Sequence, residues 1–156
     1  MSAALRKIRA VADYQFGKGV GIELFPEDVT IAYSKRTGRI RYVYLDGEPL
    51  ATLRPKDGFF SLSIIGAERI VRNVPGAGYV VIIQDDVSDF ISGGGDVFAK
   101  HVVKAGDEIR PKDEVVVVDS RKKVLAVGRA FLSGEEMEAF MKGVAVRVRR
   151  GSLRES

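Results

Sequence analysis

The stretch GGGDVFAKHVVKAGDEIRPKDEVVVVD, residues 93–119, carries the most informative pattern in this chain of 156 residues. Three consecutive glycines precede a segment that contains His101, the only histidine. The run EVVVVD at its end predicts a strand, because β-branched side chains pack well on a pleated surface. Between the two we predict a short helix that begins near Asp96, so that the glycines form a loop at its N-terminus.

A helix over residues 96–104 would have one apolar side and one basic side. At 3.6 residues per turn the apolar side gathers Phe98, Ala99, Val102 and Val103, and the other side gathers Val97, Lys100, His101 and Lys104. Glycine lets another backbone approach closely, and free N–H groups at a helix start suit phosphate oxygens. The glycine loop beside the basic side therefore indicates a phosphate-binding site. The alternatives are a plain turn before a solvated helix, and a loop that Asp96 already caps.

The rest of residues 77–156 alternates strand and turn signals. We predict strands over residues 79–84, 114–119, 124–132 and 143–151. A second short helix follows Ser133, which forms an S-x-x-E capping box with Glu136. In the last strand the alternation of side chains puts Arg147 and Arg149 on one face together with Ala145. Many short strands with two short helices predict a small mixed β barrel.

The segment VRNVPGAGY interrupts the apolar pattern near Gly76 and predicts a boundary between two domains, residues 1–76 and 77–156. In the first domain, residues 2–16 predict a helix, because one face would gather Leu5, Ile8, Ala12 and Phe16. Strands are predicted over residues 29–34, 39–45 and 49–54. The chain as a whole is therefore predicted to be α+β, with a helix packed on an antiparallel sheet before the barrel.

Composition narrows the class of protein. The chain has no cysteine, which excludes disulfides, thiolate metal sites and a cysteine nucleophile, and fits a reducing compartment. No apolar run is long enough for a signal peptide or a membrane span. We therefore expect a cytoplasmic protein without a membrane partner.

The positive charge is concentrated in the first half. The net charge is +4, and residues 1–76 hold 12 Lys/Arg against 8 Asp/Glu, whereas residues 77–156 hold 13 of each. In the hairpin KRTGRIRYVYL, Arg39 and Arg41 share one strand face near Lys35 and Arg36 at the turn. These four side chains are either phosphate contacts or a solvated hairpin. Tyr42 and Tyr44 alternate to the other face, where we expect them in the core.

Catalytic motifs are missing from the sequence. The glycine run ends in Asp96 where a P-loop needs Lys and Ser/Thr, and no G-x-G-x-x-G opens a helix. Because the chain has one histidine, a metal site would have to be built mainly from carboxylates. No serine lies in a G-x-S-x-G elbow. We expect no active site, cofactor or metal within this chain, so binding is the better hypothesis.

Residues 78–151 resemble a PUA domain, the RNA-binding module named for pseudouridine synthases and archaeosine transglycosylases. The glycine loop, V-F-A-K, R-P-x-D-E-V, A-V-G-R-A and K-G-V-A-V-x-V-R-x-G occur in the family's order. The segments DYQFGKG, SKRTGRIR and LDGEPLATLRPKDGFFSLSIIGAERI resemble the small domain that precedes the PUA domain in archaeal tRNA-guanine transglycosylases. The catalytic barrel of that family and its cysteine-bound zinc are not in this sequence.

The resemblance implies a non-catalytic protein that binds structured RNA, above all tRNA. PUA domains hold RNA against the glycine loop, the first helix and neighbouring strands, which here correspond to Gly94, Gly95, Lys100, His101, Lys104, Arg147 and Arg149. Two alternatives stay open. The chain could deliver tRNA to a catalytic protein partner, or it could be a translation factor that binds ribosomal RNA.

Overall fold

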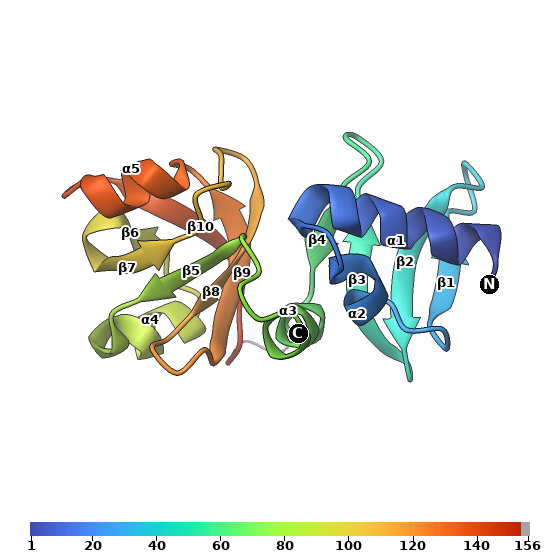
Figure 1. Cartoon of the computed structure of the whole chain (residues 1–156), viewed down its shortest axis with the longest axis horizontal. Helices are drawn as coiled ribbons and strands as arrows, with labels where there is room; N and C mark the ends of the chain where they lie inside the picture. The colour runs from blue at the N-terminus through green and yellow to red at the C-terminus, as the bar shows by residue number, and fades with distance from the viewer. Residues whose placement is uncertain (154–156) are drawn as a thin grey trace. The chain divides into compact units, whose positions relative to one another are not determined.

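The computed structural model describes residues 1–153, and the chain divides into two compact units, Met1–Gly76 and Ala77–Ser156 (Figure 1). Unit 1 combines helices with a four-stranded sheet, and unit 2 is built on a six-stranded sheet with short helices. The predicted α+β class is confirmed.

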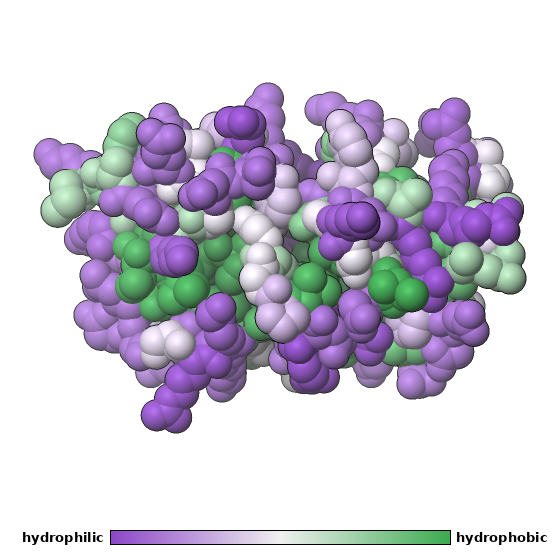
Figure 2. Space-filling model, in the orientation of Figure 1, coloured by the Kyte–Doolittle hydropathy of each residue, from purple (hydrophilic) through white to green (hydrophobic). Residues whose placement is uncertain are grey.

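Helix α1 (Ala3–Phe16) starts at Ser2, whose Oγ accepts a hydrogen bond of 3.1 Å from the N–H of Leu5. This bond satisfies one of the amides that a helix start leaves without a partner. The buried stripe is the one predicted from the spacing: Leu5, Ile8, Ala12 and Phe16. The outer side of α1 is largely hydrophilic (Figure 2), so the helix is amphipathic.

Sheet A consists of four antiparallel strands in the order β1-β2-β3-β4. The strands are β1 (Thr30–Tyr33), β2 (Ile40–Leu45), β3 (Glu48–Leu53) and β4 (Phe60–Leu62). The first three confirm the predicted strands. The sequence pattern does not predict β4, nor the helices α2 (Val20–Leu24) and α3 (Ile64–Asn73). Figure 1 shows α1 crossing this sheet.

The two faces of sheet A differ in burial. Val43, Ala51 and Leu62 are paired across β2, β3 and β4 and are at most 3% exposed. The next row, Tyr42, Thr52 and Ser61, faces the other way, and none of its members is buried. The expectation that Tyr42 and Tyr44 lie in the core is therefore wrong. Val43 takes the core position, and the alternation of a strand turns its two neighbours outward.

Gln15 joins α1 to the edge of the sheet. Its amide nitrogen donates to the Phe60 carbonyl at 2.9 Å, and its Oε1 accepts from the Phe60 N–H at 2.7 Å. Phe60 is fully buried, so these backbone groups depend on a protein partner. One side chain thus pairs both polar groups of an edge residue that no further strand covers.

Sheet B of unit 2 has the strand order β6-β10-β9-β8-β5-β7 and forms a nearly closed mixed barrel, in which β5 and β8 are parallel and the other pairs antiparallel. The strands are β5 (Val80–Ile83), β6 (Val97–Phe98), β7 (Val102–Ala105), β8 (Glu114–Val118), β9 (Val124–Ala130) and β10 (Val144–Gly151). The four predicted strands are β5, β8, β9 and β10. The barrel interior holds Val81, Ile83, Ile91, Val97, Ile109, Val115, Val117, Met137 and Val146.

Two short α-helices accompany the barrel, as predicted, but one lies elsewhere in the chain. Helix α5 (Gly134–Ala139) begins at the predicted capping box, in which Ser133 and Glu136 bond each other's backbone N–H. Helix α4 (Ser88–Ser92) comes before the glycines and follows the 3₁₀ turn η1 (Asp85–Val87). The glycines therefore end a helix.

The predicted helix over residues 96–104 is absent. This segment forms β6, the 3₁₀ turn η2 (Ala99–His101) and β7. Val97 pairs with Val146 of β10 and is fully buried, while Phe98 is 37% and Val103 60% exposed. The segment therefore forms short strands, with their two-residue alternation of side chains, in place of a helix. Val97, Val102 and Val103 are β-branched, and such side chains pack better in a strand than in a helix.

A buried ion pair links β8 to β10. Glu114 is 2% exposed, and its two oxygens accept from Nη1 and Nη2 of Arg149 at 2.8 and 2.5 Å. The Arg149 side chain is itself 40% exposed. This bidentate geometry offsets the cost of removing the carboxylate from water.

Replacing Gln15 with alanine should lower the free energy of unfolding by about 2 kcal/mol. The buried N–H and C=O of Phe60 would lose the hydrogen bonds that Gln15 makes to them. Urea denaturation followed by circular dichroism measures the change. Gln84→Ala is the matched control, since the Gln84 amide donates only to the exposed Lys100 carbonyl. Equal stability of both variants would contradict the role of Gln15.

Replacing Arg149 with alanine should cost roughly 3 kcal/mol, because the carboxylate of Glu114 stays buried after its guanidinium partner is removed. Arg147→Ala is the comparison, since Arg147 is exposed on the same strand, and we expect its stability to stay within about 0.5 kcal/mol of the parent. Thermal and urea unfolding of both variants test this. A stable Arg149→Ala variant would show that the pair contributes little.

Candidate nucleic-acid interface

The glycine turn uses its amides internally. The N–H groups of Gly93, Gly94 and Gly95 donate to carbonyls of α4, those of Asp89, Ile91 and Phe90, at 2.9 to 3.0 Å. The expectation of free amides at a helix N-terminus is therefore wrong. A phosphate at this turn would meet a helix C-terminus, whose carbonyls carry partial negative charge.

Packing explains the glycines at this turn. Gly94 has φ of +108°, a conformation that side chains rarely adopt, and a Cβ on Gly95 would overlap the ring of Phe90. The carboxylate of Asp96 accepts from the N–H of Val148 at 2.9 Å and so ties the turn to β10. Asp96 therefore fastens the turn to the barrel and caps no helix. Gly94 itself stays exposed.

The three predicted basic residues of the first segment lie on η2 and β7. Lys100 and Lys104 are exposed, and within residues 1–153 neither forms an ion pair. His101 is half-buried, with its ring edge-on to Phe98 at 6.1 Å between centroids. Its Nδ1 is buried and has no hydrogen-bond partner among the described atoms. Of the three, the two lysines are the side chains most free to meet an anion.

Arg147 on β10 faces Arg129 on β9 in the sheet register, and both are exposed. Like charges directly opposite each other destabilise a strand pair. Neither guanidinium has a carboxylate partner in the described part of the chain. The register also sets Glu114 of β8 opposite Arg129, but that carboxylate bonds to Arg149, so an anion placed between Arg129 and Arg147 would relieve the repulsion. Arg149, by contrast, is engaged with Glu114.

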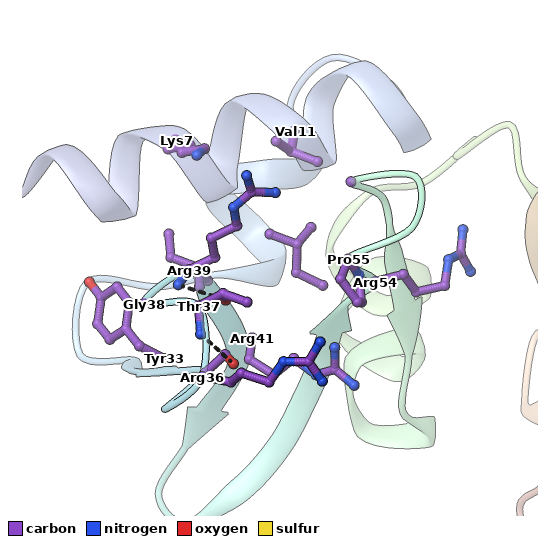
Figure 3. A pocket seen from close by; sticks show the side chains of 14 residues that line it. Lys7, Val11, Tyr33, Arg36, Thr37, Gly38, Arg39, Arg41, Arg54 and Pro55 are labelled. Carbon is purple, nitrogen blue, oxygen red and sulfur yellow. Dashed lines mark hydrogen bonds between the residues drawn. The ribbon is translucent and has the colours of Figure 1, made fainter.

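A groove of about 790 Å³ lies in unit 1 between α1 and the β1–β2 hairpin (Figure 3). Among the predicted hairpin residues, Arg36, Arg39 and Arg41 line it, and Lys35 is exposed outside it. Lys7 of α1 and Arg54 after β3 add two cations from distant parts of the sequence. The structure thus gathers five basic side chains, three of the four that the sequence pattern indicates and two that it does not.

The groove has an uneven charge balance. Arg54 is paired with Asp57 at 3.0 Å and also donates to Ser61. Lys7, Arg36, Arg39 and Arg41 form no ion pair within residues 1–153. No acidic side chain lines the groove, while Ser34, Thr37 and Tyr33 add hydroxyl groups to it. Such a lining suits a phosphate-bearing ligand.

The sequence pattern does not identify Lys7, Arg54 or Arg129 as site residues. Lys7 lies between Leu5 and Ile8 on a helix whose outer side is charged anyway, so nothing distinguishes it locally. Arg129 could be paired with Arg147 only through the register of β9 and β10. The helical period predicts the buried side of α1 but not which cation overhangs the hairpin.

The remaining titratable groups outline no further site. Two hydrogen bonds from Ser120 lower the pKa of Asp85 and hold η1 to the turn after β8. Burial, together with Asp113 and Glu108, raises the pKa of Tyr79. Over residues 1–153 no group of His, Asp and Glu is arranged to hold a metal. Nor does the described part contain a helix with the length and apolar character of a membrane span.

Comparison with known proteins gives two family matches that together span nearly the whole chain. Residues 6–76 match the patch-forming domain C2 of tRNA-guanine transglycosylase. Residues 79–152 match the PUA domain. The two matches meet where the chain divides into its two units.

Archaeal relatives contain both parts in the same order. The tRNA-guanine(15) transglycosylase of Thermococcus kodakarensis is 43% identical over 95% of this chain, and that of Methanothermobacter thermautotrophicus is 39% identical over 96%. The matches cover 25% and 23% of those proteins, in their C-terminal region. The chain thus spans about a quarter of the length of the curated relatives that it matches.

Solved structures share the fold. A hypothetical protein of Pyrococcus horikoshii matches with a TM-score of 0.78 at 22% identity, covering 99% of this chain and 94% of that one. A conserved PUA domain protein from Thermoplasma acidophilum matches with a TM-score of 0.69 at 22% identity, covering 97% and 90%. The two family matches and the archaeal relatives show that the chain belongs to the proteins that join a tRNA-guanine transglycosylase C2 domain to a PUA domain.

Proposed function

We propose that this chain is a non-catalytic RNA-binding protein of tRNA modification, with tRNA as its ligand. The observation that carries the proposal is the 43% identity, over 95% of the chain, to a tRNA-guanine(15) transglycosylase. The C2 and PUA family matches support it, because the relatives that align with both parts are named tRNA-guanine(15) transglycosylases. The proposed role is to hold the RNA, while the chemistry belongs to a catalytic protein partner.

In unit 2 the proposed contacts are Lys100, Lys104 and Arg147, with Arg129 added by the strand register. These side chains are exposed and would neutralise phosphates. His101 is proposed to contact RNA through the part of its ring that is not buried. Gly94 is exposed and would contribute a surface without a side chain, close to which a sugar can lie. Gly95, whose Cβ position the Phe90 ring occupies, is proposed to contribute by shaping the turn. Arg149 would act indirectly, by keeping β10 in register through Glu114.

The groove of unit 1 is proposed as a second phosphate contact. Its unpaired cations lie in the half of the chain that carries the excess of positive charge, 12 Lys/Arg against 8 Asp/Glu. Duplex RNA hides its base edges in a deep, narrow groove, so recognition of a folded RNA rests on its backbone and shape. Two separate phosphate contacts therefore suit a large structured RNA better than a short one.

Replacing both Lys100 and Lys104 with alanine should weaken binding to tRNA and to an unrelated duplex by a similar factor, about three- to tenfold. The slope of log affinity against log salt concentration should decrease by the equivalent of about one to two phosphate contacts. Equilibrium titration at two salt concentrations measures both quantities. The double variant Lys122→Ala, Lys123→Ala removes the same charge from the β8–β9 turn and is the control. Unchanged affinity and slope would remove this surface from the proposed interface.

Reversing the charge of the groove with Lys7→Glu and Arg39→Glu should reduce tRNA affinity by about tenfold or more at low salt, because attraction becomes repulsion. The double variant Lys18→Glu, Arg72→Glu makes the same change of charge at exposed positions outside the groove lining and should cost less than about threefold. Filter binding with total tRNA compares the variants. If this control weakens binding as much as the groove variant, only net charge matters and the groove is no site.

A further inference from the structure

The outward face of sheet A presents two tyrosine rings above a floor of small side chains. Tyr42 lies on β2 in one cross-strand row with Ala32, Thr52 and Ser61. Tyr44 lies in the next row, beside Thr30 and Pro49. None of these residues is buried, and Tyr42 is 38% exposed. Both rings are therefore partly accessible to solvent on an interior strand of the sheet.

The two rings offer separate surfaces. Their centroids are 6.2 Å apart, and the ring planes are tilted by 39°. Side chains two residues apart on a strand point the same way about 6.6 Å apart, so each ring can take one flat partner. Tyrosine rings bury much apolar area at a small cost in conformational entropy, and a nucleobase is a flat partner of matching size.

Arg41 connects this face to the basic groove. Its guanidinium carbon lies 5.7 Å from the centroid of the Tyr42 ring, and the same residue lines the groove with Lys7 and Arg39 (Figure 3). Tyr42 faces away from the core row that contains Val43, and the groove lies on the α1 side, so Arg41 is the side chain that touches both. An RNA strand that follows Arg41 out of the groove would then have a tyrosine ring beside its bases. Stacking on aromatic rings next to a cationic track is the physical basis of single-strand binding.

We propose that the Tyr42–Tyr44 face binds unpaired nucleotides of an RNA by stacking their bases, while Arg41 and the groove hold the adjoining phosphates. The inference rests on the proposed RNA-binding function and extends it, because it assigns unit 1 to single-stranded rather than double-helical RNA. A duplex keeps its bases stacked inside and cannot use the tyrosines.

The test compares a ten-nucleotide single-stranded RNA that carries 2-aminopurine with a duplex RNA of ten base pairs. The variant Tyr42→Ala, Tyr44→Ala should lose at least about tenfold in affinity for the single strand and should abolish the fluorescence change that stacking of 2-aminopurine causes. Affinity for the duplex should change less than about twofold. Tyr42→Phe keeps the ring and should bind both RNAs like the parent.

Tyr14→Ala is the matched control, since Tyr14 is 80% exposed on α1 of the same unit and lies outside the face. Equal melting curves for all variants would exclude unfolding as the cause of lost binding. A parent protein that binds tRNA and duplex but not the single strand overturns the inference and leaves the proposed function standing. A tyrosine double variant that still binds the single strand does the same. Failure of the parent to bind any RNA overturns both.

Discussion

Backbone packed directly against backbone is the constraint on which the barrel of unit 2 depends. A side chain on Gly106 would overlap the carbonyl of Gly78, and one on Gly134 would overlap the carbonyl of Gly106. At the other side of the barrel, a side chain on Gly151 would overlap the carbonyl of Ser92 at the end of α4. Because strands, turns and helix ends approach this closely, the 80 residues of unit 2 close around an apolar interior without disulfides.

This close packing changes the meaning of the glycine turn. The sequence resemblance to PUA domains suggests a phosphate-binding turn here. In the structure the amides of the turn donate to carbonyls of α4, and the Asp96 carboxylate accepts from β10. In the proposed interface the turn would therefore contribute shape, while the charge would come from side chains that the barrel turns outward. Arg147 and Arg129 show this, since the register that buries Val146 also sets two guanidinium groups opposite each other in water.

Local patterns predict most of the fold and little of the site. The stripe of α1, the capping box at Ser133 and four strands of the barrel follow from residues within one element. The pattern of residues 96–104 fits both a helix and a strand. Val97, Ala99 and Val102 suit either a side of a helix or a face of a strand. Tyr42 points outward because Val43, its neighbour on the strand, takes the core position. Since tyrosine and valine both occur in protein cores, the sequence alone does not show which of the two is buried. The groove needs Lys7 from α1, about thirty residues before the hairpin, so only tertiary structure can show it.

In the proposed function the two units act at different distances from the RNA, because their net charges differ. Residues 77–156 are neutral overall, so Lys100, Lys104 and Arg147 act on an RNA that is already close, within a Debye length of about 8 Å at physiological salt. Residues 1–76 carry the net positive charge and attract a polyanion from farther away. Because one short connection joins the two units, binding by either raises the local concentration of RNA for the other. Modest contacts in each unit would then suffice for firm binding, and unit 2 needs no preformed phosphate cradle at its glycine turn.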